Sequence, residues 1–522
     1  MSEANDEHRV HVHRVVTDNT TMLSKLNLCG VRVSKQIARV FALKKYEKFA
    51  RNCYSTIFAL SSGLQPRGNA IAIIRVSGPE TIDVIDGLTR GKSQKMLAKT
   101  RTAVLCSLYD PQTNDLIDKA IVIYFPSASS YTGEDLCELH VHGSHAVVSS
   151  LLEVIGKFNG CRPSEAGEFT KRAFLNGKID LTEAEGISHL IAAQTTAQRR
   201  NALKAVTGVL TQHYDNWRRT LLEIIAYLEA NIDFSEDQLL DEEMLNGVVK
   251  KATSLKDEIN TFLTETTKKS ERIIHGLEIA IMGEPNVGKS SLINKLCQRQ
   301  VSIVSPISGT TRDIVETHLD VGGYAVRICD TAGIKDLSAP LTDVIEEEGI
   351  KRAITRAQSV DLIIYVIDGS KDDIETAIEN SQKHSQIMKN AACIIFVVNK
   401  MDLISDKMVK MWKENKSKQN ICILSCKTSE GFEDFIDILT KNIDTLCGQS
   451  LNEEAIFSTE RHKTHLYKVS ENIESGLSHY KKDLAISAHY FREACKELSF
   501  ITGRISTEDI LDVIFKDFCI GK

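Results

Sequence analysis

The chain has 522 residues, more than one hydrophobic core usually serves, so roughly two to four domains are expected. Its net charge of -6 excludes a general attraction to nucleic acid, and any contact with RNA would need a local basic patch. The 13 cysteines include no CxxC pair, which argues against a disulfide framework or a zinc finger and favours a reducing intracellular compartment. No apolar run reaches the roughly 18 residues that a membrane-spanning helix needs.

The first 52 residues have the composition of a targeting segment. After an acidic start, the stretch from Met22 is rich in Lys and Arg, interleaved with apolar residues and nearly free of acids. This composition is typical of a mitochondrial transit peptide, and a basic disordered arm is the alternative. We therefore expect residues 1–52 to be a transit peptide or disordered extension, and the protein to work in the mitochondrial matrix.

Residues 53–165 are predicted to fold as an α+β domain. Strand patterns occur at AIAIIRVSG, TAVLCSLYD, KAIVIYFP and CELHVHG, and a helix pattern follows at AVVSSLLEVIGKF. The histidines of HVHGSH could suggest a metal, but nothing nearby convincingly completes the four ligands that zinc prefers.

Two helical segments enclose a domain of different texture. Residues 166–270 and 450–522 place apolar residues at spacings of three and four, which predicts amphipathic helices in a bundle. Residues 271–449 alternate short apolar strands with helix-length segments, which predicts a mostly parallel sheet covered on both faces. The expected fold class is therefore multidomain, α+β and α/β, with the α/β domain inserted into the helical domain. Basic residues such as Arg218 and Arg219 could touch RNA, although solvated helix faces are the commoner explanation.

The α/β domain carries a phosphate-binding loop. GEPNVGKSS, residues 283–291, follows a strand and opens a helix, which is the context that the pattern GxxxxGK[ST] requires. Backbone N–H groups would wrap the phosphates, Lys289 would reach the outer phosphates, and Ser290 would ligate Mg²⁺. The expected nucleotide contacts of this loop are Asn286, Val287, Gly288, Lys289, Ser290 and Ser291.

Further motifs in the same domain indicate the base and a second Mg²⁺ ligand. In NKMD, Asp402 can accept hydrogen bonds from both the ring N–H and the exocyclic amine of guanine, which predicts GTP over ATP. SCKTSEG would add backbone contacts around the base, and Thr311 of SGTTRD would be the second Mg²⁺ ligand. Together with DTAG these motifs add Thr310, Asp330, Thr331, Ala332, Gly333, Asn399, Lys400, Ser425, Cys426 and Lys427 to the expected contacts.

The residue after DTAG raises a question about hydrolysis. In many GTPases this position supplies a polar group that aims the attacking water, but here it is Ile334. An isoleucine side chain neither donates nor accepts a hydrogen bond. Either the site hydrolyses nothing, or the missing function is supplied elsewhere.

Together with YTGED at 131–135, AGEFTKRAFLNGKIDL at 166–181 and FCIGK at 518–522, these motifs resemble the MnmE (TrmE) family of tRNA modification GTPases, in a mitochondrial form. The resemblance covers about residues 53–522. It implies a homodimeric, K⁺-stimulated GTP hydrolase that works with the flavoprotein MnmG, which carries FAD and NADH. The pair would modify C5 of the wobble uridine of mitochondrial tRNA, with a carboxymethylaminomethyl or taurinomethyl product.

The resemblance also suggests how Ile334 is tolerated. A K⁺ ion beside the phosphates would stabilise the developing charge, and a glutamate beyond DTAG would orient the water. Glu346 is expected to be that catalytic glutamate, while the neighbouring Glu347 and Glu348 are alternatives and a solvated helix start would also explain the acids. The expected K⁺ ligands are Asn286, Ser305, Ile307 through its carbonyl, and Thr310.

A folate site is implied in the N-terminal domain, where members of this family bind a tetrahydrofolate derivative at a dimer interface. An Arg-Lys-carboxylate set suits a pterin ring and a glutamyl tail. Cys519 is expected to join Lys289 and Glu346 in the catalytic set as a reactive or site-lining thiol, although a buried structural cysteine fits equally. The matching folate contacts are Arg75, Glu134, Lys178 and Lys522.

Two other functions remain open. An Era-type GTPase switch in mitochondrial ribosome assembly would carry an RNA-binding KH module with a GXXG loop, which the segment after the α/β domain lacks. A scaffold that binds GTP without turnover would fit Ile334, but intact Lys289, Ser290, Thr311 and Asp330 weigh against it.

Overall fold

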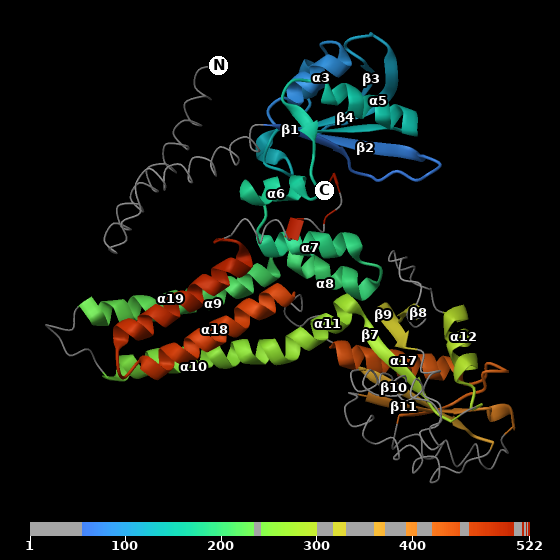
Figure 1. Cartoon of the computed structure of the whole chain (residues 1–522), viewed down its shortest axis with the longest axis vertical. Helices are drawn as coiled ribbons and strands as arrows, with labels where there is room; N and C mark the ends of the chain where they lie inside the picture. Colours follow the sequence, from blue (N-terminus) through green and yellow to red (C-terminus); the bar gives the residue numbers. More distant parts are fainter. Residues whose placement is uncertain are drawn as a thin grey trace, which may run out of the picture. The chain divides into compact units, whose positions relative to one another are not determined.

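The computed structural model divides into two compact units, which are described separately (Figure 1). The first unit comprises residues up to Lys178 together with the segment from Phe518, and the second runs from Ile179 to Asp517. The structure describes residues 55–233, 242–284, 286–299, 317–329, 360–370, 393–403, 420–448, 459–505, 514–515, 518 and 520–521.

The first unit is built on a six-stranded sheet in the order β3-β4-β5-β2-β1-β6. Neighbouring strands are antiparallel, except that β6 runs parallel to β1. Alternate residues of β2 join side chains of α3 and α5 in one core, so one face of the sheet is covered by helices. The strands are β1 (Thr56–Leu60), β2 (Asn69–Ser77), β3 (Val104–Tyr109), β4 (Leu116–Phe125), β5 (Leu136–Gly143) and β6 (Cys161–Pro163). The helices are α3 (Thr81–Thr89), α4 (Ser93–Leu97), α5 (His145–Gly156) and α6 (Glu168–Leu175), with a 3₁₀ turn η2 (Ser127–Ser129).

The four predicted strands and the predicted helix of this unit are present as β2 to β5 and α5. The sequence analysis did not anticipate β1 and β6, which are short strands of five and three residues. A strand of that length carries too few alternations to stand out from a loop.

The structure differs from the expected boundary at residues 165 and 166. Helix α6 belongs to the first unit, where its Phe169 packs in a buried cluster with Ile57 and Ala59 of β1. The FCIGK segment, expected with the second helical part, also belongs to this unit, since Ile520 forms a backbone bridge with Ala166. A helical apolar pattern shows that a helix has a buried face, but it does not show which core that face joins.

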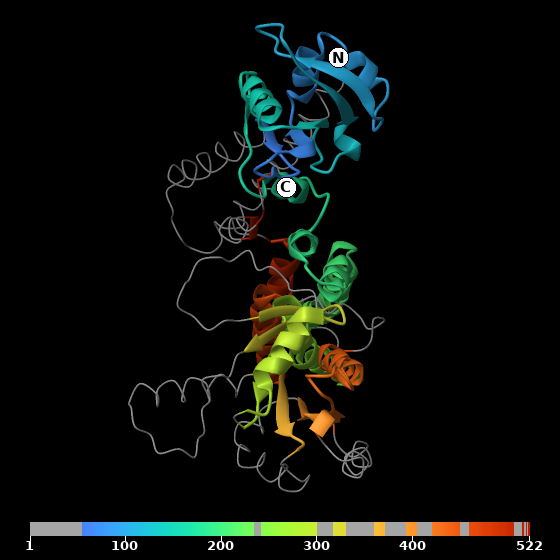
Figure 2. The same ribbon diagram turned by 90° about the vertical axis from the view of Figure 1, so that its right-hand side faces the viewer.

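The helical part of the second unit combines two segments that are far apart in the sequence. Figures 1 and 2 both show α18 and α19 alongside α9 and α10. Leu221 of α9, Leu466 of α18 and Phe491 of α19 share one buried core. The helices are α7 (Leu181–Ala192), α8 (Thr196–Val206), α9 (Val209–Asp233), α10 (Glu242–Thr261), α11 (Thr267–His275), α18 (Glu460–His479) and α19 (Leu484–Thr502), with a π-helical turn η3 (Phe262–Thr266).

The second sheet has the order β12-β11-β10-β7-β9-β8, and its strands are parallel except that β8 is antiparallel to β9. All seven residues of β10 are buried, because separate apolar clusters cover the two faces. The prediction of a mostly parallel sheet is therefore confirmed. Its elements are β7 (Leu277–Met282), β8 (Thr317–Val321), β9 (Tyr324–Cys329), β10 (Leu362–Asp368), β11 (Cys393–Asn399), β12 (Ile421–Ile423), α12 (Lys289–Arg299), α17 (Phe432–Cys447) and the 3₁₀ turn η4 (Met401–Leu403).

None of the helices in the described part of the chain combines the length and the apolar character needed to cross a bilayer.

Candidate functional site

The backbone of the loop between β7 and α12 requires glycine at two positions. Gly283 has φ 141° and Gly288 has φ 102°, which are values that side chains disfavour. A Cβ atom at Gly283 would overlap the carbonyl oxygen of Val366, and one at Gly288 would overlap the side-chain amide of Asn399. The backbone therefore passes close to β10 and β11, as a loop that wraps phosphates must.

Helix α12 begins at Lys289, so its N-terminal N–H groups follow this loop directly. The Lys289 ammonium donates to the carbonyl oxygens of Gly283 and Glu284, both at 2.7 Å. Ser290 and Ser291 are exposed in the first turn of the helix. A cation and a helix N-terminus at one place favour an anion such as a phosphate.

Asn399 joins three loops. Its side chain is nearly fully buried at the end of β11, and its Nδ2 donates to the carbonyl oxygen of Val287 at 2.8 Å. Its Oδ1 accepts from the backbone N–H of Cys426 at 3.0 Å. The structure thus brings the phosphate-binding loop, NKMD and SCKTSEG together, as separate motifs of one site.

Residues of NKMD and SCKTSEG are hydrogen-bonded to one another. One carboxylate oxygen of Asp402 accepts from the hydroxyl of the buried Ser425 at 2.7 Å. Lys295 of α12 donates to the carbonyl oxygen of Cys426 at 3.3 Å, while Lys427 is exposed. Burial raises the pKa of the Cys426 thiol to about 11, so this sulfur stays protonated at neutral pH.

In the first unit, Arg75 and Glu134 each have a charged partner. Arg75 on β2 donates to Glu138 of β5 through Nε at 3.1 Å and Nη2 at 2.7 Å, beside the rings of Tyr131 and Phe169. The Arg75–Glu138 pair follows from the sheet register, which places the two residues opposite each other. Lys178 is exposed and donates to the carbonyl oxygen of Ala128 at 2.8 Å.

Glu134 depends on a residue that the sequence analysis did not single out. The buried Arg172 of α6 donates to the Glu134 carboxylate at 2.9 Å, and the Ser77 hydroxyl donates to it at 3.0 Å. Arg172 also pairs with Glu168 at 3.0 Å. A basic residue inside the quoted motif AGEFTKRAFLNGKIDL is the signal that could have identified it.

The C-terminal segment is fixed against β1. The Ser61 hydroxyl donates to the carbonyl oxygen of Gly521 at 2.8 Å, and Gly521 has φ 91°. A Cβ atom at Gly521 would overlap the carbonyl oxygen of Leu60. This backbone therefore lies in close contact with the end of β1, in the unit that holds Arg75 and Glu134.

Two family models match the chain: the MnmE helical domain over residues 181–519, and the GTP-binding protein TrmE N-terminus over residues 56–178. The chain belongs to the MnmE family. A Danio rerio relative, the mitochondrial "5-taurinomethyluridine-[tRNA] synthase subunit GTPB3", is 40% identical, and the match covers 90% of this chain and 93% of that protein. The human protein of the same name is 39% identical, with the same coverage of both chains. The "tRNA modification GTPase MnmE" of Rickettsia typhi is 40% identical, over 90% of this chain and all of that protein.

One solved structure is similar to part of this MnmE-family chain. Aquifex aeolicus Era bound to GDP·AlF4⁻ is 22% identical and covers 38% of this chain and 66% of its own, with a TM-score of 0.25. With so low a TM-score, this match gives no information about the fold or function of the chain.

Several residues that the MnmE resemblance implicates lie outside the described residues. These are Ser305, Ile307, Thr310, Thr311, Asp330, Thr331, Ala332, Gly333, Glu346, Cys519 and Lys522, together with Ile334, Glu347 and Glu348. Their roles stay predictions. Within the described ranges, no group of three His, Cys, Asp or Glu side chains could hold a metal ion.

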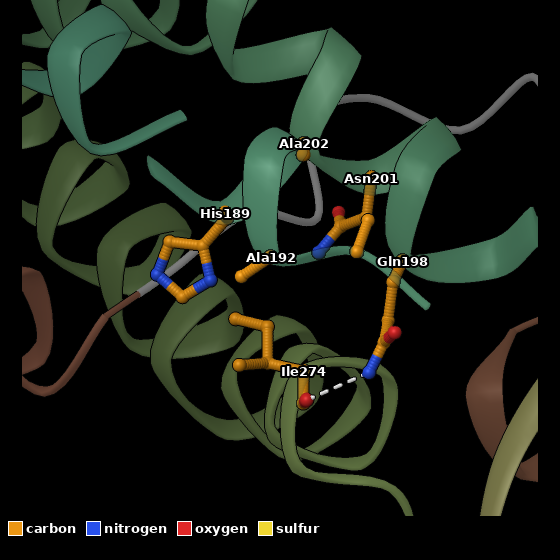
Figure 3. Close-up of a pocket in the computed structure, with 7 residues that line it drawn as sticks. His189, Ala192, Gln198, Asn201, Ala202 and Ile274 are labelled. Atoms are coloured by element: carbon orange, nitrogen blue, oxygen red, sulfur yellow. Dashed lines mark hydrogen bonds between the residues drawn. The ribbon is translucent and has the colours of Figure 1, made fainter. Parts of the chain in front are cut away.

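The second unit of this MnmE-family chain also contains a small cavity of about 50 Å³, away from the nucleotide motifs (Figure 3). It lies between α7, α8 and α11, and Gln198 at its rim donates to the carbonyl oxygen of Ile274 at 3.0 Å. Burial lowers the pKa of His189, one of its lining residues. Sites for organic ligands enclose roughly 300–1,000 Å³, so this cavity is too small for a nucleotide.

Proposed function

We propose that this protein is a GTP hydrolase that modifies the wobble uridine of mitochondrial tRNA. The observation that carries the proposal is Asn399, whose bonds to the Val287 carbonyl and the Cys426 N–H unite the phosphate and guanine motifs. The chain also matches nearly the whole length of relatives named as tRNA modification GTPases and as mitochondrial 5-taurinomethyluridine synthase subunits. These names support tRNA as the substrate and the mitochondrion as the location, and within it we propose the matrix.

The residues present fit a guanine nucleotide with Mg²⁺. The close approach of Gly283 and Gly288 to their neighbours leaves backbone, rather than side chains, to face the phosphates. Ser290 would hold Mg²⁺ together with Thr311, and the ion would neutralise charge on the outer phosphates. Lys289 would bind the same phosphates, and Asp402 would accept from guanine.

A K⁺ ion is proposed as the second cation of the site. Asn286 supports this, since it lies exposed on the phosphate loop with φ 65° and carries an amide oxygen suited to a hard cation. The other proposed ligands are Ser305, Ile307 and Thr310. When bound, K⁺ would supply a fixed positive charge near the phosphates, and Glu346 would orient the attacking water in place of Ile334.

The first unit is proposed to bind a tetrahydrofolate derivative. Glu134, fixed by Arg172 and Ser77, would accept from pterin N–H groups, and Arg75 would bind a carboxylate of the glutamyl tail. The close contact of Gly521 with Leu60 supports the inclusion of Cys519 and Lys522 in this site. Cys519 lies two residues before Gly521 in the sequence, and Lys522 directly follows it. Lys178 would add a further cation at the surface.

The proposed partners are a second copy of the chain and an MnmG-type flavoprotein that brings FAD and NADH. Exposed apolar side chains on the sheet of the first unit support the dimer. Leu105 is 73% exposed and pairs in register with Ile121, which is 41% exposed, and Ile71 is 61% exposed on β2. An uncovered apolar sheet face favours burial against another protein surface.

Nucleoside mass spectrometry of mitochondrial tRNA tests the modification directly. Cells depleted of this protein should lose the C5-modified wobble uridine, and the wild-type chain should restore it. Lys289→Ala should fail to restore it, while Cys519→Ser shows whether the thiol is needed. Unchanged wobble uridine after depletion would contradict the proposal and favour an Era-like role in mitochondrial ribosome assembly.

The GTPase rate in KCl and in NaCl tests the cation. Wild type should be faster in KCl, and Asn286→Ala should lose that difference. Glu346→Ala should be slow in both salts. Equal wild-type rates in the two salts would exclude the K⁺ proposal and leave GTP hydrolysis itself untouched.

A further inference from the structure

Asp368 is a buried charge at the nucleotide end of β10. Its side chain is 4% exposed, and its Oδ2 lies 2.6 Å from the ammonium of Lys400 in NKMD. Its other carboxylate oxygen accepts from the Ser370 hydroxyl at 2.6 Å and from the Ser370 N–H at 3.1 Å. None of the sequence motifs includes this residue. A single acid that ends an otherwise apolar strand is the signal that could have identified it.

The partner of Asp368 has an unfavourable backbone conformation. Lys400 has φ 66°, in the left-handed region that costs a residue with a side chain about 1 kcal/mol or more. Such a conformation persists only where the surroundings hold it. Asp368 provides the side-chain contact, and the adjacent Gly369 N–H donates to the carbonyl oxygen of Asn399 at 3.0 Å. The end of β10 therefore fixes NKMD by both backbone and side-chain bonds.

We propose that Asp368 is a positioning residue for guanine recognition, because its ion pair with Lys400 holds NKMD in the conformation that aims Asp402 at the base. This inference rests on the proposed GTP function. Ser425 holds Asp402 from the β12 side, and Asp368 holds the same loop from the β10 side. With the loop ordered in advance, less ordering has to occur when the nucleotide binds.

The charge of Asp368 is maintained by its neighbours. Burial by itself would raise the pKa of its carboxyl group, but the hydrogen bonds from Lys400 and Ser370 outweigh burial and lower that pKa. The group is therefore a carboxylate at neutral pH. An asparagine at this position would keep the shape while it removed the negative charge that Lys400 requires.

Asp368→Asn tests the inference, with Asp361→Asn as its matched control. Asp361 lies at the opposite end of β10, where it accepts from Arg272 at 2.8 Å and from the Glu278 N–H at 3.1 Å. Both variants remove one ion-paired carboxylate at an end of the same strand, so they share the loss of an ion pair that stabilises β10. Only Asp368→Asn should alter nucleotide recognition.

Steady-state kinetics with GTP and with ITP, which lacks the exocyclic amine, give the readout. Asp368→Asn should raise KM for GTP about tenfold, with kcat within about twofold of wild type. The preference for GTP over ITP should fall about fivefold, because a misplaced Asp402 no longer reads the amine. A merely structural role would lower the fraction of active enzyme and leave both KM and the GTP/ITP preference unchanged.

A second variant tests whether Asp368 acts through Lys400. If it does, adding Asp368→Asn to Lys400→Met should change KM by less than about twofold, whereas independent roles would give additive effects. Additive effects, an unchanged KM and GTP/ITP preference in folded Asp368→Asn, or an equal change in Asp361→Asn would overturn the inference. Absence of GTP turnover in the wild type would instead contradict the proposed function.

Discussion

The side-chain amide of Asn399 donates to the backbone carbonyl of Val287 across 2.8 Å, and this bond joins the guanine motif to the phosphate loop. The same side chain also accepts from the Cys426 N–H at 3.0 Å. Because Asn399 is nearly fully buried, water cannot readily replace either bond. Nucleotide affinity and the stability of the α/β domain should therefore both depend on this one residue.

Asn399→Ala is expected to lower the free energy of unfolding by about 2 kcal/mol, because it leaves a buried carbonyl and a partly buried N–H unpaired. GTP affinity should fall by at least about tenfold. Asn442→Ala on α17 is the matched control, since the Asn442 amide also bridges elements without touching the nucleotide motifs. It donates to the carbonyl oxygen of Ile438 at 2.8 Å and accepts from Asn420 and from the Cys393 thiol, both at 3.2 Å. Thermal unfolding and titration with a fluorescent GDP analogue would measure both effects. Normal GDP affinity in folded Asn399→Ala would contradict the expectation.

Gly288→Ala should abolish nucleotide binding without unfolding the helical part of the second unit. The new Cβ would overlap the Asn399 amide, and alanine disfavours the φ of 102° at this position. Gly247→Ala is the control, because Gly247 lies in α10 with open space around its Cβ position. That change should stabilise the helix by about 0.5–1 kcal/mol. Calorimetry with GDP, beside circular dichroism, checks both variants, and measurable GDP binding by Gly288→Ala would refute the prediction.

The residues of the nucleotide site were predictable because each motif is a local pattern next to a strand. Gly288, Asn399 and Asp402 could all be named without knowing how the strands pair. The strand pattern marks Asp368 as a terminal acid but does not predict its role, because its partner Lys400 lies 32 residues further along the chain, directly after β11. Only the parallel register of β10 with β11, which pairs Asp368 with Asn399, brings the two charges together.

In the first unit, too, the contacts between distant elements could not be predicted from the sequence. The pattern of α6 correctly predicted a helix, but the contact of Phe169 with β1 decides which core it joins. The same holds for Arg172, which pairs with Glu134 across 38 residues of sequence. Long-range ion pairs depend on how elements pack, and spacing in the sequence does not encode that packing.

Glu185→Gln should destabilise the second unit by about 3 kcal/mol at neutral pH, because it leaves the largely buried guanidinium of Arg461 without a counter-charge. Glu185 of α7 lies 2.7 Å from Nε of Arg461 and 2.7 Å from Nε2 of the fully buried His462. Burial alone would raise the pKa of Glu185, but His462 and Arg461 outweigh burial and lower it to about 2.

The direction of this pKa shift fixes the pH dependence. A carboxyl group with a lowered pKa in the folded state adds stability above its ordinary pKa near 4.5, and that stability disappears as the pH falls towards about 2. The difference between wild type and Glu185→Gln should therefore shrink below about pH 4.5. Glu223→Gln removes an exposed pair with Lys251 and should cost less than about 1 kcal/mol. Denaturant unfolding from about pH 7 to about pH 3 tests this, and a difference that stays constant with pH would rule out the Glu185 explanation.

Gly521→Ala should separate tRNA modification from GTP hydrolysis. The added Cβ would overlap the Leu60 carbonyl oxygen, and the φ of 91° disfavours alanine, so the C-terminal segment should leave its seat against β1. Gly63→Ala is the matched control in the same unit, since Gly63 also has a positive φ, of 68°, but nothing within 4 Å of its Cβ position. It introduces comparable backbone strain without the overlap.

We expect Gly521→Ala to keep a GTPase rate within about twofold of wild type, because the seat of Gly521 and the nucleotide motifs belong to different units. Wobble-uridine modification in rescued cells should fall at least about tenfold. Gly63→Ala should restore modification. Full modification by Gly521→Ala would mean that the position of the FCIGK segment does not matter for the chemistry. It would also remove the support that the contact of Gly521 with Leu60 gives to Cys519 and Lys522 as site residues, although the bridge between Ile520 and Ala166 would remain.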